Sequence, residues 1–218
     1  MPRTARASVG GICYHVMNRA NGGTRIFECP ADYRAFVNLI AAAGDRVPMR
    51  ISAWCLMPNH FHLVLWPLED GDLSRWMQWL LTAHVRRYHN ARGPDSRGRV
   101  WQGRFKAFPV QQDAHLLTVL RYVERNPLRA SLTPWAEDWP WSSLGSPDAL
   151  TLTTPLIRPS GWVGLVNSAQ TVAEVEALDR SVTRGTPLGT ADWVAATVRD
   201  LGLESSIRFR GRPRKEVP

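Results

Sequence analysis

The chain has 218 residues, of which 44% are hydrophobic, enough for one well-buried domain with an appendage. No apolar run approaches the roughly 20 residues of a membrane span, and residues 1–11 lack the apolar segment of a signal peptide. We therefore expect a cytoplasmic protein without a membrane partner. The net charge of +8, supplied almost entirely by arginine, favours nucleic acid as the partner, since guanidinium groups match phosphate oxygens, and hence a nucleoid-associated protein.

Strand and helix patterns alternate along the first two-thirds of the chain. Alternating polar and apolar residues predict strands, whereas apolar residues three and four apart predict amphipathic helices. Their order fits an α+β fold with an antiparallel sheet and helices on one face, as in ferredoxin-like and RNA-recognition-motif folds. The predicted strands are 12–17, 49–56, 60–66 and a segment ending near 110, and the predicted helices are 30–43, 72–89 and 115–125.

The third predicted helix has a defined start and end. Asp113 stands where an N-cap side chain would accept bonds from the first free backbone N–H groups. Asn126 and Pro127 are expected to end the helix, because the residue before a proline is biased out of the helical region.

The chain changes character after residue 150. A Thr/Pro/Gly-rich stretch leads to shorter helical patterns at 172–178 and about 190–202. We therefore expect a main domain over residues 1–150 and a C-terminal accessory region with short helices and a basic tail over residues 151–218. The tail resembles an AT-hook, whose Arg-Gly-Arg-Pro core lays arginines along a narrow minor groove.

The predicted strand at 60–66 carries two histidines two residues apart. Side chains alternate between the faces of a strand, so His60 and His62 point the same way while Phe61 and Leu63 point toward a core. Two imidazoles on one strand face can bind one divalent metal ion. Such a pair is more often a packed or exposed one, so support for a metal site must come from a second element.

The helix at 115–125 and its end supply that second element. Tyr122 and Asn126 are four residues apart, hence neighbours on one helix face. Asn126 offers a carbonyl oxygen suited to a hard cation, and Tyr122 offers a phenol that can be a nucleophile. A cation would polarise a phosphodiester enough for this weak nucleophile to attack phosphorus. The alternative is that Tyr122 is packing and Asn126 a C-terminal cap.

Four blocks of sequence carry a resemblance to a known family. They are Tyr14–Arg19 (YHVMNR), Cys55–Val64 (CLMPNHFHLV), Trp101–Lys106 (WQGRFK) and Arg121–Ala130 (RYVERNPLRA). In order and spacing, these blocks resemble the single-tyrosine HUH transposases, and within them the REP-associated tyrosine transposases of bacteria. The resemblance extends over most of the predicted main domain.

This resemblance implies a metal-dependent single-stranded DNA endonuclease and strand transferase. It implies Mg²⁺ or Mn²⁺ held by His60 and His62, with Asn126 where the family has a polar residue completing the metal site. Tyr122 would attack hairpin DNA and form a 5′-phosphotyrosine, leaving a free 3′-OH. Relatives in insertion sequences are expected to be dimers and REP-associated ones monomers. We expect a monomer with Tyr122 acting in its own chain, and a homodimer is the alternative.

Hairpin DNA would be held mostly through its phosphates, with bases of the single-stranded flank read directly. Any single arginine could equally be a solvated surface charge. An aromatic ring such as Trp101 could stack on a splayed base, and a core position is its alternative. The candidate nucleic-acid-binding residues are Arg3, Arg6, Arg19, Arg86, Arg87, Trp101, Gln102, Arg104, Lys106, Arg208, Arg210, Arg212, Arg214 and Lys215.

Two other functions fit parts of the sequence. A non-catalytic DNA- or RNA-binding protein on the same fold would use the basic tail, and its histidines would be structural. A zinc hydrolase is disfavoured, because no third histidine or acidic ligand stands at helical spacing with His60 and His62. A covalent protein–DNA adduct would distinguish the transposase from the binding protein.

Overall fold

A four-stranded antiparallel sheet forms the centre of the molecule, with the strands in the order β2-β3-β1-β4. The computed structural model describes residues 8–208. The α+β class and the antiparallel sheet predicted from the sequence are confirmed. The strands are β1 Cys13–Arg19, β2 Met49–Met57, β3 His60–Pro67 and β4 Lys106–Val110, and the three long helices are α1 Pro30–Arg46, α2 Asp72–Arg92 and α3 Ala114–Arg129.

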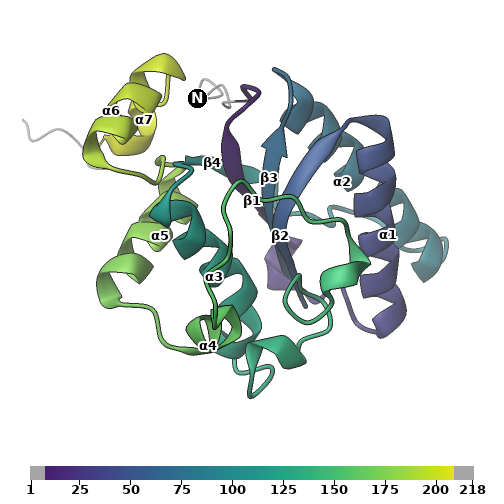
Figure 1. Cartoon of the computed structure of the whole chain (residues 1–218). Helices are drawn as coiled ribbons and strands as arrows, with labels where there is room; N and C mark the ends of the chain where they lie inside the picture. Colours follow the sequence, from purple (N-terminus) through teal and green to yellow (C-terminus); the bar gives the residue numbers. More distant parts are fainter. Residues whose placement is uncertain (1–7, 209–218) are drawn as a thin grey trace, which may run out of the picture.

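Helices cover both faces of this sheet (Figure 1). Helices α1 and α2 pack on the face that carries Phe61 and Leu63, whereas α3 packs on the face that carries Val64. The prediction of helices on one face is therefore right for α1 and α2 but wrong for α3. The reason lies in the strands, since the last seven residues of β2 are all buried and both faces of the sheet need cover.

Helix α3 begins as predicted and ends later than predicted. The Asp113 side chain accepts a hydrogen bond from the backbone N–H of His115, which confirms the N-cap. Pro127 lies inside the helix, so the predicted end at Asn126 is wrong. The side-chain amide of Asn126 donates to the Tyr122 carbonyl at 2.8 Å and to the Val123 carbonyl at 3.5 Å. The second bond gives a donor to the Val123 carbonyl, because Pro127 has no backbone N–H to donate to it.

The region after residue 150 packs against the sheet and α3. Leu152 bridges to β2 and Leu188 bridges to the end of β4. Trp162 and Val166 join the apolar cluster under α3, and Thr190 caps the predicted helix near 190. The proposed division of the chain at residue 150 stays a prediction. The helices of this region are α4 Trp162–Asn167, α5 Val172–Arg184, α6 Ala191–Asp200 and α7 Glu204–Ile207.

Within residues 8–208, no helix combines the length and the apolar character that crossing a membrane requires.

His84 on α2 makes the fold sensitive to acid. Its ring is 5% exposed and packs between the rings of Phe36 and Trp101, and burial lowers its pKa to about 4. The unfolded chain therefore binds more protons between pH 6.5 and 4, so stability falls as the pH falls through this window, by up to about 3 kcal/mol. The midpoint of urea denaturation should fall between pH 7 and pH 4.5, and we expect this fall to be smaller in His84→Leu than in wild type. His89→Gln on the same helix is the control. If the midpoint depended on pH equally in the two variants, the assignment to His84 would be contradicted.

Candidate active site

Strand β3 presents His60 and His62 on the face that α3 covers. Their ring centroids lie 5.0 Å apart with the planes at 83°. His62 is 2% exposed and His60 is half-buried. The predicted alternation along this strand is confirmed, because Phe61 between them is fully buried on the opposite face.

Helix α3 brings Tyr122 against the histidines. The Tyr122 ring lies 5.7 Å from the His62 ring, edge to face at 89°. Burial raises the pKa of Tyr122, and the Arg129 guanidinium, 5.6 Å from the ring centroid, acts in the opposite direction. The phenol is thus protonated at neutral pH, with a cation beside it that favours the phenolate.

Asn126 lies one helical turn after Tyr122 and is 8% exposed. Its side-chain nitrogen is used by the Tyr122 carbonyl. Its side-chain oxygen has no hydrogen-bond donor among the residues that the structure describes. The oxygen is therefore the atom of Asn126 that remains for a cation.

Asn59 fixes the proton of His60. The Asn59 side-chain nitrogen donates to the Gly23 carbonyl at 2.9 Å, so its side-chain oxygen is the atom 2.7 Å from Nδ1 of His60. A carbonyl oxygen only accepts, so Nδ1 of His60 must carry the proton. The lone pair of His60 then lies on Nε2, which is the form that binds a metal.

A third histidine, which was not predicted from the sequence, lies in the site. His15 on β1 is fully buried, and its Nε2 lies 2.9 Å from Nδ1 of His62. His15 pairs with Val64 across β1 and β3, so His15 and His62 lie on the same face of the sheet. The one hint in the sequence was a histidine within an otherwise apolar strand. The contact between His15 and His62, which are 47 residues apart, follows only from the register of the two strands.

The two imidazoles are in the uncharged form that can bind a metal ion. Burial, reinforced by Arg19, lowers the pKa of His60 to about 4. Burial also lowers the pKa of His62 well below its usual range, with smaller contributions from its neighbours. Both rings are therefore neutral near pH 7, as metal ligation requires. Within residues 8–208 no three His, Cys, Asp or Glu side chains are grouped for a metal ion, so a cation here would rely on two imidazoles and the Asn126 oxygen.

The segment before β4 lies beside the histidines. Arg19 stands opposite His60 in the β1–β3 pair, and the Arg19 carbonyl accepts from the backbone N–H of Gln102. Lys106, which opens β4, pairs with Met17. These contacts place Arg19, Gln102 and Lys106 near one end of the sheet, as a shared nucleic-acid surface requires.

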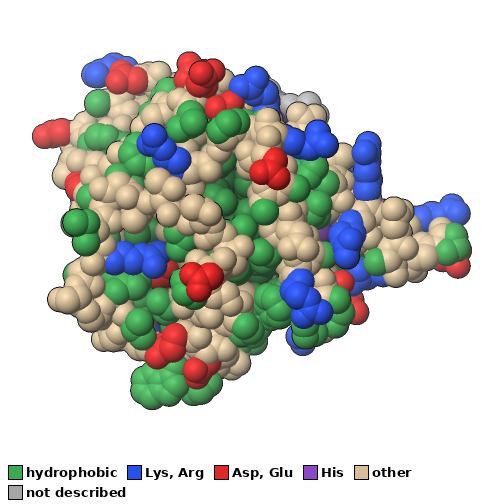
Figure 2. All heavy atoms as spheres, turned by 45° about the vertical axis from the view of Figure 1, so that its right-hand side comes forward, with side chains coloured by type: hydrophobic (Ala, Val, Ile, Leu, Met, Phe, Trp, Pro, Cys, Tyr) green, Lys and Arg blue, Asp and Glu red, His purple; other side chains and the backbone are tan. Residues whose placement is uncertain are grey.

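A cavity of about 830 Å³ lies between α2 and this segment. Its apolar walls include Leu81 and Val85, and its arginines are Arg86, Arg99 and Arg104. Lys and Arg side chains gather on the right-hand part of the face shown in Figure 2.

Trp101 lines the same cavity, but it is 6% exposed and packs edge to face on Phe61, so most of its ring lies in the core. Arg87 lines a different pocket, against α1. Arg208 is the last described residue, and Arg3, Arg6, Arg210, Arg212, Arg214 and Lys215 lie outside the described residues.

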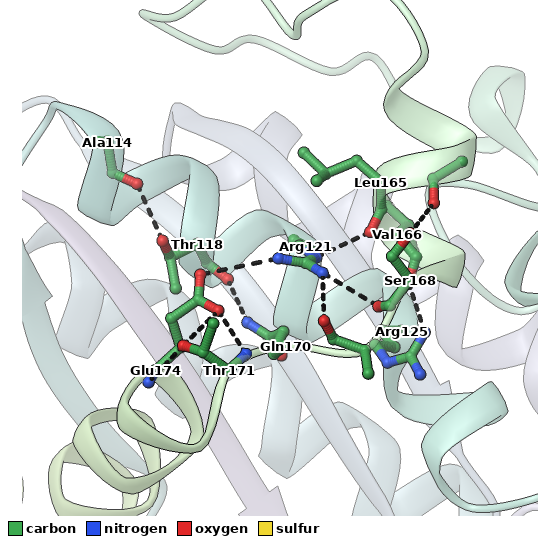
Figure 3. A network of polar contacts seen from close by, with 12 residues as sticks. Ala114, Thr118, Arg121, Arg125, Leu165, Val166, Ser168, Gln170, Thr171 and Glu174 are labelled. Atoms are coloured by element: carbon green, nitrogen blue, oxygen red, sulfur yellow. Dashed lines mark hydrogen bonds and ion pairs between the residues drawn. The ribbon is translucent and has the colours of Figure 1, made fainter.

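Charged residues on the outer side of α3 hold it against the C-terminal region (Figure 3). Arg121 donates to the carbonyls of Leu165, Ser168 and Ala169, and Arg125 donates to those of Val166 and Asn167. The carbonyls of Leu165, Val166 and Asn167 are free acceptors in the last turn of α4, where a positive charge is favourable, and those of Ser168 and Ala169 follow directly. The helix that carries Tyr122 is thus held from the side opposite the sheet.

Comparison with known proteins gives consistent matches. The family model described as "Transposase IS200 like" matches residues 8–126. The chain is 24% identical over 158 residues to the REP-associated tyrosine transposase of Escherichia coli (strain K12), covering 71% of this chain and 86% of that protein. It is 26% identical over 107 residues to a putative REP-associated tyrosine transposase of Haemophilus influenzae, covering 45% and 61%. The fold is similar to that of a REP-associated tyrosine transposase solved with a REP hairpin, with a TM-score of 0.56, 21% identity and coverage of 79% and 93%.

Proposed function

Because the chain belongs to the family of IS200-like transposases, we propose that it cleaves and rejoins single-stranded DNA at a hairpin through a covalent bond to Tyr122. The observation that carries the proposal is that His62 lies between the two other residues, with its ring 5.7 Å from that of Tyr122 and 5.0 Å from that of His60. The contact between Tyr122 and His62 is made within one chain, which supports a monomer with Tyr122 acting in its own site. The proposed nucleic-acid partner is hairpin DNA with a single-stranded flank.

His60, His62 and Asn126 fit a divalent cation, Mg²⁺ or Mn²⁺, which is the proposed cofactor. Nδ1 of His60 and the nitrogen of Asn126 are already used within the protein, which leaves Nε2 and the amide oxygen as ligand atoms. Two imidazoles and one amide leave coordination positions for phosphate oxygens and water. When bound, the cation polarises the phosphodiester and offsets its charge.

Tyr122 performs the exchange of bonds. Its phenol oxygen attacks phosphorus and gives its proton to solvent, and a P–O bond to Tyr122 forms. The bond between phosphorus and the 3′ oxygen breaks, and that oxygen takes up a proton from solvent. The products are a 5′-phosphotyrosine and a free 3′-OH. A 3′-OH can later attack the phosphotyrosine and release Tyr122, so joining needs no ATP because one phosphodiester replaces another. Arg129 beside the ring favours the phenolate during attack and release.

The arginine-lined cavity between α2 and the segment before β4 supports a path for the single-stranded flank. Arg86, Arg99 and Arg104 on its wall are exposed, and none forms an ion pair among the described residues. Unpaired guanidinium groups are available to phosphates. Each phosphate contact to single-stranded DNA contributes about 0.7 to the slope of log affinity against log salt.

We therefore expect an Arg86→Gln, Arg99→Gln, Arg104→Gln variant to bind labelled hairpin DNA more weakly and with a salt slope smaller by about 2. Fluorescence anisotropy from 50 to 300 mM salt measures the slope. The matched control removes three exposed arginines on α5 and α6, through Arg180→Gln, Arg184→Gln and Arg199→Gln. Equal losses of slope in both triple variants would show that only the net charge matters.

The proposed function is tested by incubating the whole chain with hairpin oligonucleotides labelled at either end. We expect a covalent adduct in denaturing gels, formed with Mn²⁺, abolished by EDTA and carrying only the label on the 3′ side of the break. Tight binding without an adduct, under conditions that support a positive-control transposase, would favour the non-catalytic binding protein.

A further inference from the structure

We infer that His15 is a positioning residue that determines, through one shared proton, whether His62 can bind a cation. The inference rests on the proposed function, because it concerns the same metal site. His15 lies in the first of the four sequence blocks, and the resemblance to the family gave it no role.

The contact between the two rings has the geometry of a hydrogen bond. Nε2 of His15 lies 2.9 Å from Nδ1 of His62, and the ring planes differ by only 14°. His15 is fully buried and also packs on the ring of Phe108 at 4.9 Å. A hydrogen bond between these two nitrogens needs one proton, which is carried either by Nε2 of His15 or by Nδ1 of His62.

Two arrangements of that proton have opposite consequences. If Nε2 of His15 carries it, His15 donates to Nδ1 of His62, and the proton of His62 then lies on Nε2, where it blocks a metal ion. If Nδ1 of His62 carries it, His15 accepts, and the lone pair of His62 lies on Nε2. Only the second arrangement gives a ligand, so His15 must be an acceptor in the metal-bound protein.

His15 differs from Asn59 in this respect. Asn59 is locked as an acceptor for His60 by its bond to the Gly23 carbonyl. His15 can be either donor or acceptor, because its Nδ1 is buried and has no hydrogen-bond partner among the described residues. His60 is therefore already in the protonation form that binds a cation, whereas His62 takes that form only when His15 accepts a hydrogen bond from its Nδ1.

Two substitutions separate this role from simple packing. Phenylalanine at position 15 keeps the ring and its contact with Phe108 but cannot accept a hydrogen bond. Glutamine places an amide near the position of Nε2 and can accept. We expect His15→Phe to weaken Mn²⁺ binding roughly 10- to 100-fold, while His15→Gln stays within about threefold of wild type. A packing role predicts the reverse order, because His15 is fully buried and its other ring neighbours are Phe108 and Tyr122.

The test measures Mn²⁺ affinity of the whole, DNA-free chain by calorimetry or by electron paramagnetic resonance. Nitrogen-15 spectra of the wild-type imidazoles with Mg²⁺ give a second readout that needs no variant. We expect both His15 and His62 to carry their protons on Nδ1. His62 protonated on Nε2 with Mg²⁺ bound, or His15→Phe binding Mn²⁺ like wild type, would overturn the inference.

The outcome is distinguishable from failure of the proposed function. Wild-type protein that forms the DNA adduct but binds no Mn²⁺ would overturn the role of His15 and leave cleavage by Tyr122 in place. If the wild-type protein forms no adduct, and Mn²⁺ affinity is lost in His15→Phe but not in His15→Gln, the role of His15 is supported and the cleavage is contradicted.

Discussion

Replacing Tyr122 with phenylalanine is expected to remove the covalent protein–DNA adduct below detection, a loss in rate on the order of 10⁶-fold, as when an enzyme loses its nucleophile. The variant lacks only the oxygen that would bond to phosphorus. The ring, which packs 5.7 Å from His62 and 6.0 Å from His15, is kept. We expect the free energy of unfolding to change by less than about 1.5 kcal/mol, the scale of one hydrogen bond.

Tyr88→Phe on α2 is the matched control for this prediction. Tyr88 is half-buried, and its ring lies under the Arg92 guanidinium. The control removes the same oxygen at a position outside the site and should form the adduct at the wild-type rate. An adduct in Tyr122→Phe would mean that another side chain is the nucleophile, and peptide mapping of the DNA-linked fragment would identify it.

The parts of this site that are local in sequence could be predicted. The alternation of His60, Phe61 and His62 assigns faces within one strand, and the spacing of Tyr122 and Asn126 assigns one face of one helix. These assignments need only the geometry of a single element. The four sequence blocks of the family then bring the two elements together.

The parts that depend on how elements pack could not be predicted. His15 reaches His62 through strand register, which no local pattern sets. The face covered by α3 depends on both faces of β2 being apolar. The sequence left Trp101 open between base stacking and a core position, and its contacts with Phe36 and Phe61, from elements far apart in the chain, favour the core.

The extension of α3 past Pro127 also lay beyond local rules. Proline in a helix usually leaves a carbonyl without a donor. Here Asn126, the residue before it, supplies a side-chain donor to the preceding turn. Asn126 thus has two uses, since its nitrogen keeps the helix intact and its oxygen remains for the proposed cation.

Removing Arg158 is expected to destabilise the protein by about 3–5 kcal/mol, because it would leave a charge buried without its partner. Glu124 on α3 is fully buried and accepts hydrogen bonds from Arg158 at 2.7 Å, from Ser143 at 2.6 Å and from the Trp162 indole at 2.7 Å. Two neutral donors remain in Arg158→Met, but the positive charge is gone. Urea denaturation measures the loss.

A double variant tests whether the loss comes from the unpaired carboxylate. Glu124→Met together with Arg158→Met replaces the ion pair by apolar side chains, which is often neutral or stabilising, so most of the stability should return. Arg199→Ala breaks the exposed pair with Asp200 and should cost less than about 1 kcal/mol. A double variant as unstable as Arg158→Met would show that the guanidinium acts through other contacts, such as its bond to the Ser52 carbonyl.

Loss of Arg158 should also slow the chemistry beyond its effect on the folded fraction. Glu124 lies between Tyr122 and Asn126 on α3, and Arg158 ties that turn to the C-terminal region. A displacement of about 1 Å at a nucleophile can cost about 100-fold in rate. We expect adduct formation by fully folded Arg158→Met, at low temperature, to be slower by roughly that factor while hairpin affinity is unchanged. Wild-type rates would mean that the sheet face alone positions Tyr122.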